Sequence, residues 1–177
     1  MIRLFAALAL PPDAGQALKL RQTGIGGARW SPPQNLHVTL RFFGDLREDV
    51  ARDLDVELLT LPMPPIDLML EGAGCFQDGP GIHAVWAGVT ENPDLRRLAK
   101  ACEAAARRAG IKADLRLYRP HVTLAYLRHA DPAEVTAWIQ ANNLLKSPPI
   151  RLTRFGLYSS HRTKAGSRYE LEALYPA

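Results

Sequence analysis

The stretch HVTL at residues 37–40 occurs a second time at residues 121–124, which is 84 residues further along the chain. A second pattern recurs at the same spacing, because Pro-Pro-Ile-x-Leu-x-x-x-Gly begins at Pro64 and again at Pro148. Two independent matches at one spacing indicate an internal duplication, a feature that bears on the whole fold. The chain is therefore predicted to contain two copies of one unit.

The duplication also predicts the domain organisation. With 177 residues, the chain is long enough for one domain of two closely packed lobes, with approximate halves 1–80 and 81–177. The segment Asp78-Gly79-Pro80-Gly81 between them has the composition of a turn and is too short for a flexible linker. We therefore expect a single bilobed domain.

The composition is that of a globular protein, with 47% apolar and 23% charged residues. No apolar run approaches the roughly 18 residues of a membrane-spanning helix. The two cysteines, Cys75 and Cys102, lack the spacing of a disulfide framework or a zinc site. The formal net charge of +4, supplied mainly by arginine, is compatible with a phosphate-bearing partner. We expect a cytoplasmic monomer with free thiols, no membrane association, and neither metal nor other cofactor.

Hydrophobic periodicity predicts the order β-α-β-α-β twice, followed by one further strand. In that last strand Tyr169, Leu171, Ala173 and Tyr175 alternate and are expected on one face. The fold class is therefore α+β: a duplicated bilobed fold with two mainly antiparallel sheets facing a central cleft, a pseudo-twofold axis, and helices on the outside. Strands are expected at 2–9, 36–43, 66–71, 82–89, 121–128, 149–158 and 168–175, and helices at 13–22, 48–60, 93–109 and 132–142.

The HVTL strands carry the candidate chemistry. Residues i and i+2 of a strand share a face, so His37 and Thr39 point to one side, and so do His121 and Thr123. If the two strands meet about the pseudo-twofold axis, two imidazoles and two hydroxyls converge on the cleft. Arg41, four residues after His37, shares its face by the same parity.

Two imidazoles near neutral pH suit general acid–base catalysis, because one can be neutral while the other is protonated. The neutral ring accepts a proton from water, and the protonated ring donates one to a leaving oxygen. The hydroxyls of Thr39 and Thr123 can hydrogen-bond phosphate oxygens, with an arginine adding positive charge. This chemistry needs no metal, and the sequence holds no metal-binding motif.

In this pattern the chain resembles the two-histidine phosphoesterase superfamily. The likeness is closest to the branch of RNA 2′,3′-cyclic phosphodiesterases, also described as 2′-5′ RNA ligase-like. Ordered blocks along nearly the whole chain carry it: residues 3–6 (RLFA), 29–30 (RW), 33–44 (PxNLHVTLRFxG), 119–125 (RPHVTLA), 157–160 (LYxS) and 166–169 (GxxY).

The resemblance implies metal-independent opening of a terminal 2′,3′-cyclic phosphate of RNA to a 2′-phosphomonoester. It assigns His37 as proton donor to the leaving 3′ oxygen, His121 as the base that activates water, and the two threonines as phosphate ligands. Because the two halves look equivalent, the residues alone leave open which histidine is the acid. The implied partners are RNA 3′ ends or small cyclic nucleotides.

The chain departs from the family at one position. Many relatives carry an arginine two residues after the second motif, where this chain has Tyr126. Either Arg41 or Arg128 is therefore expected to supply the phosphate-binding charge, or the cleft accepts a different substrate. Phe42, Phe43 and Tyr126 are candidates for stacking against a base, an interaction worth about 1–3 kcal/mol.

Two other functions fit the same residues. The cleft can act on 2′-5′-linked oligonucleotides or small cyclic nucleotides, with reversible ligation of 2′-5′ ends. Alternatively, the protein is a non-catalytic module that binds RNA ends, which predicts steeply salt-dependent binding without turnover. The paired histidines favour catalysis, since binding alone has no need of two groups that titrate near neutral pH.

Overall fold

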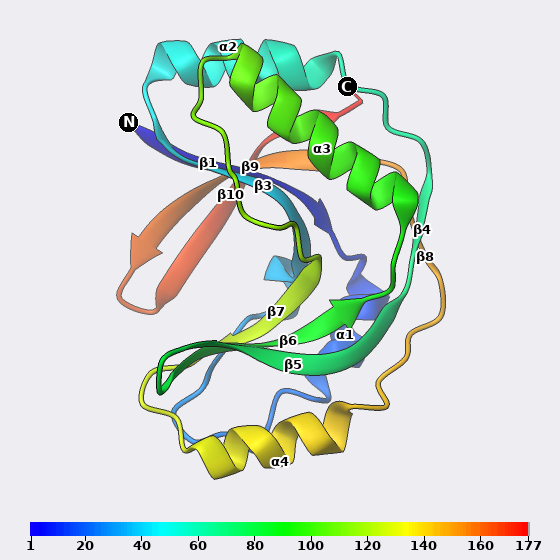
Figure 1. The fold of residues 1–177 in the computed structure, drawn as a ribbon, viewed down its shortest axis with the longest axis vertical. Helices are drawn as coiled ribbons and strands as arrows, with labels where there is room; N and C mark the ends of the chain where they lie inside the picture. Colours follow the sequence, from blue (N-terminus) through cyan, green and yellow to red (C-terminus); the bar gives the residue numbers. More distant parts are fainter. Residues whose placement is uncertain (177) are drawn as a thin grey trace.

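The computed structural model describes residues 1–176 and shows two lobes with helices on their outer faces (Figure 1). The helices are α1 (Pro12–Lys19), α2 (Glu48–Leu59), α3 (Pro93–Arg108) and α4 (Pro132–Asn142), with a short 3-10 turn, η1, at Pro33–Asn35. The strands are β1 (Ile2–Ala9), β2 (Arg29–Trp30), β3 (His37–Leu46), β4 (Ile66–Leu68), β5 (Leu70–Asp78), β6 (Gly81–Val89), β7 (His121–Tyr126), β8 (Ile150–Leu152), β9 (Phe155–Thr163) and β10 (Gly166–Tyr175).

The bilobed α+β class is confirmed, and all named strand pairs are antiparallel. The two expected sheets are joined into one of eight strands, in the order β10-β9-β1-β3-β7-β6-β5, with β2 beside β7. The first lobe contains the strands from β10 to β3, and the second contains β7, β6, β5 and β2. The two HVTL strands are thus neighbours where the lobes join and do not face each other across open space.

The two halves of the sequence exchange elements between the lobes. Strand β5 belongs to the first half of the sequence but pairs with β6 of the second half, and β9 belongs to the second half but pairs with β1 of the first. Helix α3 crosses over as well: it comes from the second half but lies beside α2 over the first lobe, whereas α4 covers β5 at the far end of the second (Figure 1). This exchange ties the lobes into one body.

Residues 84 apart lie directly opposite each other at two places. Val38 pairs with Val122 where the lobes join, and Asp67 pairs with Arg151 in the small β4–β8 sheet. The Asp67 carboxylate also forms an ion pair with the Arg151 guanidinium at 3.0 Å. Opposed residues in an antiparallel pair are related by a local twofold axis, so this register is the one a duplicated chain would have. The division at residue 80 stays a prediction.

Three details differ from the expected elements. The segments 66–71 and 149–158, each predicted as one strand, both divide between the small sheet and the large one. Residues along β10 do not alternate strictly, because a bulge lies between Leu171 and Ala173. Leu171 is consequently half exposed, while Tyr175 is buried.

The helices are held by conventional caps and apolar contacts. The Asn92 side chain accepts from the N–H of Leu95 at the start of α3, and the Asp131 side chain accepts from Ala133 at the start of α4. On α3, Leu95, Leu98 and Cys102 face the core, and full burial of a leucine contributes about 1.5–3 kcal/mol. Within residues 1–176, none of the helices has the length and hydropathy needed to cross a membrane.

Candidate active site

The pairing of Val38 with Val122 positions the four residues of the predicted site. Both valines are fully buried, so the side chains on either side of them point to the opposite face of the sheet. The antiparallel direction then sets His37 beside Thr123 and Thr39 beside His121. One pair of residues therefore brings both histidines and both threonines to one face.

The two imidazoles are held in the same way. Nδ1 of His37 lies 2.6 Å from the carbonyl oxygen of Asn35, and Nδ1 of His121 lies 2.7 Å from that of Arg119. A carbonyl only accepts hydrogen bonds, so each Nδ1 carries the proton. Each Nε2 is therefore the nitrogen free to exchange a proton with a substrate.

Burial lowers the pKa of both histidines. For His37, desolvation is the largest cause, opposed by the hydrogen bond to Asn35 and assisted by the nearby charge of His121. For His121, desolvation again dominates, opposed by the hydrogen bond to Arg119. Both rings are accordingly neutral at neutral pH in the free protein, and a bound anion would favour protonation of one of them.

Aromatic side chains pack around each imidazole. His37 lies 5.1 Å from the ring of Phe5 and 5.4 Å, edge to face, from Tyr169. His121 lies 4.6 Å from the ring of Phe76, also edge to face, and 6.3 Å from Trp86. These contacts account for the desolvation and fix the ring orientations, as a proton-transfer site requires.

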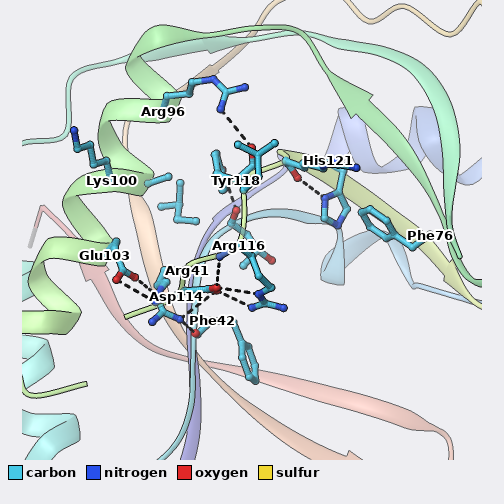
Figure 2. A pocket seen from close by; sticks show the side chains of 15 residues that line it. Arg41, Phe42, Phe76, Arg96, Lys100, Glu103, Asp114, Arg116, Tyr118 and His121 are labelled. Carbon is cyan, nitrogen blue, oxygen red and sulfur yellow. Dashed lines mark hydrogen bonds and ion pairs between the residues drawn. The ribbon is translucent and has the colours of Figure 1, made fainter. Parts of the chain in front are cut away.

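Two hollows meet at this face. One, of about 680 Å³, is bordered by His121, and the other, of about 270 Å³, is bordered by His37. Thr39 and Phe42 border both hollows and so lie between the histidines. Figure 2 shows the larger hollow, where Phe76 and Tyr118 lie near His121 and Phe42 lies at the other end, beside Asp114.

The parity argument for Arg41 is wrong. Ala6 of β1 is opposite Arg41 while Ala7 is opposite Thr39, so Leu40 is an extra residue in β3. Such a bulge changes which side chains share a face, so simple alternation no longer places Arg41 beside Thr39. Phe42 borders both hollows with Thr39, whereas Arg41 is buried and borders only the larger one.

Arg41 instead forms a largely buried ion-pair network. Its guanidinium donates to the Glu103 carboxylate of α3 and to the carbonyl of Lys112, and it lies 3.6 Å from the Asp114 carboxylate (Figure 2). Hydrogen bonds from Arg116 lower the pKa of Asp114 to about 2, so that carboxylate stays ionised. The charge of Arg41 is thus compensated within the protein, although Arg41 borders the larger hollow together with Thr39 and His121, and its role as a phosphate ligand stays a prediction.

The structure places only some of the other predicted substrate-binding residues at the two hollows. Phe43 is buried in the core, because β3 has a second register shift at this residue, and it is wrong as a stacking surface. Phe42 and Tyr126 both border the smaller hollow beside His37. Arg128 is exposed and borders neither hollow, so it lies outside the site around the two histidines.

Sequence reasoning missed the cations that do border the smaller hollow, which are Arg3, Arg29 and Arg162. Arg29 is directly opposite Tyr126 in the β2–β7 pair, and its guanidinium lies 5.8 Å from the centre of the Tyr126 ring. It therefore brings positive charge to the place where many relatives carry an arginine. The block at residues 29–30 belongs to the family resemblance, but its place beside Tyr126 depends on a long-range pairing of the two-residue strand β2 with β7.

Among residues 1–176, no cluster of three or more histidine, cysteine, aspartate or glutamate side chains could hold a metal ion. Both cysteines are free thiols. Burial raises the pKa of the Cys102 thiol to about 12, so it is unreactive at neutral pH.

Known proteins resemble this chain over nearly its whole length. The family model described as LigT like Phosphoesterase matches residues 8–86 and 88–169. The chain is 26% identical to the RNA 2′,3′-cyclic phosphodiesterase of Archaeoglobus fulgidus over 96% of its own length and 97% of that protein. It is 30% identical to the protein of that name from Escherichia coli, over 94% and 92% of the two chains.

Solved structures show the same fold. The structure of Escherichia coli LigT complexed with 3′-AMP superposes with a TM-score of 0.77 at 26% identity, covering 98% of this chain and 97% of that one. A structure from Thermus thermophilus gives a TM-score of 0.79 at 24% identity, covering 98% and 96%.

Proposed function

This chain belongs to the family of LigT-like phosphoesterases, and from that premise we propose that it hydrolyses the 2′,3′-cyclic phosphate of RNA 3′ ends to a 2′-phosphomonoester. The observation that carries the proposal is the presence of two imidazoles on one face, each with Nδ1 hydrogen-bonded to a carbonyl and Nε2 free. The names of the full-length relatives support the reaction.

The proposed step needs two proton transfers on opposite sides of phosphorus. Nε2 of His121 accepts a proton from water as the water oxygen bonds to phosphorus. With the substrate bound, His37 is the protonated imidazolium; the bond from phosphorus to O3′ breaks, and Nε2 of His37 donates its proton to that oxygen while Nδ1 keeps its own. The products are a free 3′ hydroxyl and a 2′-phosphomonoester, and the two rings exchange protons with solvent to restore the starting state.

Three groups are proposed to hold the phosphate. Thr39 and Thr123 flank the buried valine pair and offer hydroxyl donors to the non-bridging oxygens. Arg29, beside Tyr126 in the smaller hollow, supplies the positive charge. This assignment replaces Arg41 and Arg128 as the phosphate-binding cations.

The decisive experiment identifies the product. Purified protein is incubated with adenosine 2′,3′-cyclic phosphate in the presence of EDTA, and 2′-AMP and 3′-AMP are resolved by ion-exchange chromatography. We expect 2′-AMP and no effect of EDTA, since every proposed group belongs to the chain. Formation of 3′-AMP would contradict the roles of the two histidines, and absence of turnover would contradict the proposed function.

A further inference from the structure

A second basic groove adjoins the smaller hollow. Its volume is about 1050 Å³, and Arg29 and Tyr126 border both the groove and the hollow that contains His37. The groove is therefore continuous with the candidate active site. Its remaining lining residues are Gly27, Pro80, Gly81, Ile82, His83, Leu127, Arg128, His129, Ala130, Thr163 and Lys164.

The charge of this groove has one sign. Arg29, Arg128 and Lys164 are cations, His83 and His129 add two imidazoles, and none of its lining residues is acidic. The larger hollow differs, because Glu103 and Asp114 border it. Within residues 1–176, neither Arg128 nor Lys164 has a salt-bridge partner. These two charges are therefore free to bind an anionic ligand.

The groove lies between the tips of two hairpins that project to the same side of the molecule (Figure 1). Pro80 and Gly81 belong to the β5–β6 hairpin of one lobe, and Thr163 and Lys164 belong to the β9–β10 hairpin of the other. The turn after β7 borders the same groove, and His129 within it has a φ of 56°. A non-glycine residue in this region is uncommon and is often found at functional turns.

We propose that this groove binds the phosphodiester backbone of single-stranded RNA on the 5′ side of the cyclic phosphate, so that the preferred substrate is an oligonucleotide. The inference rests on the proposed function and deepens it. In the terminal ribose, the base leaves from C1′, next to C2′, whereas the 5′ chain leaves from C4′, next to C3′. Base and upstream chain therefore leave the ribose at opposite ends, the base beyond C2′ and the upstream chain beyond C3′.

The proton-transfer roles orient this substrate. His37 donates to O3′, so C3′, C4′ and the upstream chain lie on the His37 side of the phosphorus. That side opens through Arg29 and Tyr126 into the basic groove. The base is directed toward the larger hollow, where Phe42 and Phe76 offer apolar surface. Uniform positive charge along the groove suits a backbone contact independent of sequence.

The test compares two substrates that share the reacting group. One is adenosine 2′,3′-cyclic phosphate, which has no 5′ phosphate, and the other is a five-nucleotide RNA that ends in the same group. Arg128→Glu and Lys164→Glu are made singly and together. A matched control reverses the charge at Arg52 of α2 and Arg107 of α3 by substitution with glutamate. Both side chains are exposed and remote from the groove.

We expect the groove double variant to lower kcat/KM for the oligonucleotide by about tenfold or more, and to leave turnover of the mononucleotide within about twofold. The dependence of log(kcat/KM) on log salt concentration should also be steeper for the oligonucleotide, by roughly 0.7 for each phosphate contacted. The Arg52→Glu/Arg107→Glu control should change kcat/KM by no more than about twofold for either substrate.

Equal loss on both substrates, or no loss on the oligonucleotide, would overturn the groove assignment while leaving the proposed function in place. The same loss in the control would also overturn it, because net charge and not the groove would then explain the effect. An unmodified protein that turns over neither substrate would contradict the proposed function itself.

Discussion

Val38 lies directly opposite Val122 in the one residue pair that registers β3 against β7 within residues 1–176. Because the strands are antiparallel, this contact places each histidine next to the threonine of the other motif. The candidate site is thus assembled at the boundary of the lobes, where a small change in register would separate its four residues.

Replacing either histidine tests the proposed proton transfers. His37→Ala and His121→Ala should each lower kcat for adenosine 2′,3′-cyclic phosphate by about 10²–10⁴-fold, the usual contribution of general acid–base catalysis. The double variant should lose little more than the worse single variant, because the two rings act in one step. His161→Ala is the control, since its Nε2 lies 3.1 Å from the Ser159 hydroxyl and outside both hollows. Activity retained in either single variant would refute the mechanism.

Arg29 and Tyr126 provide a rescue experiment. Arg29→Ala should lower kcat/KM for the mononucleotide about 10- to 100-fold, since a hydrogen bond to a charged group contributes about 1.5–3 kcal/mol. Adding Tyr126→Arg should restore part of that loss, because the two residues are opposed in the β2–β7 pair. Arg151→Ala, which removes a guanidinium paired with Asp67 in the other sheet, controls for net charge. An unchanged kcat/KM in Arg29→Ala would remove Arg29 from the site.

The lowered pKa values predict a displaced pH profile. The step needs His121 neutral and His37 protonated, so kcat/KM rises with pH through the pKa of His121 and falls through that of His37. Burial lowers both pKa values in the free protein. The optimum of kcat/KM should therefore lie on the acid side of about 6.5.

The profile of kcat should be displaced in the opposite direction. Bound anionic phosphate stabilises the protonated ring and raises its pKa, so the optimum of kcat should lie at higher pH than that of kcat/KM. Initial rates at saturating and limiting mononucleotide separate the two profiles. A kcat/KM that stays maximal into the alkaline range would show that no protonated histidine is required.

The network around Arg41 predicts an effect on stability. Glu103→Ala removes the main partner of a guanidinium that is 9% exposed, and breaking a buried pair costs up to about 3–5 kcal/mol. Because Glu103 is 24% exposed and Asp114 remains nearby, we expect a loss of about 2 kcal/mol in the free energy of unfolding. Urea unfolding measures it, with Glu57→Ala as the control at an exposed pair with Arg108. If Arg41→Ala raised KM without loss of stability, Arg41 would be a phosphate ligand after all.

Gly74 supports His121 through Trp86. A Cβ at residue 74 would collide with the Trp86 ring, which packs against His121. Gly74→Ala should therefore displace the indole and lower the free energy of unfolding by about 1–3 kcal/mol. The fold-decrease in kcat should be larger than the fold-change in KM. Gly79→Ala, in the hairpin turn that follows β5, is a control in which a Cβ meets no neighbour, although its φ of 55° adds some strain. Normal kcat in a destabilised Gly74→Ala would show that the imidazole does not depend on this contact.

The two histidines and two threonines could be predicted because side-chain alternation is a property of the local backbone. An HVTL strand places its first and third residues on one face whatever it pairs with. The repeat at a spacing of 84 then indicated that two such faces belong together. Duplication and strand periodicity were enough for the fold class and for these four candidates.

The cations and the exchange of strands depended on tertiary structure. Arg41 lies in a buried ion-pair network at the edge of the larger hollow, where β3 carries an extra residue opposite β1, and such a bulge arises from the pairing of two strands distant in sequence. Arg29 borders the smaller hollow because the two-residue strand β2 pairs with β7, nearly a hundred positions along the chain. Local sequence thus determined which way each histidine and threonine points, whereas contacts between distant segments decided which charges surround them.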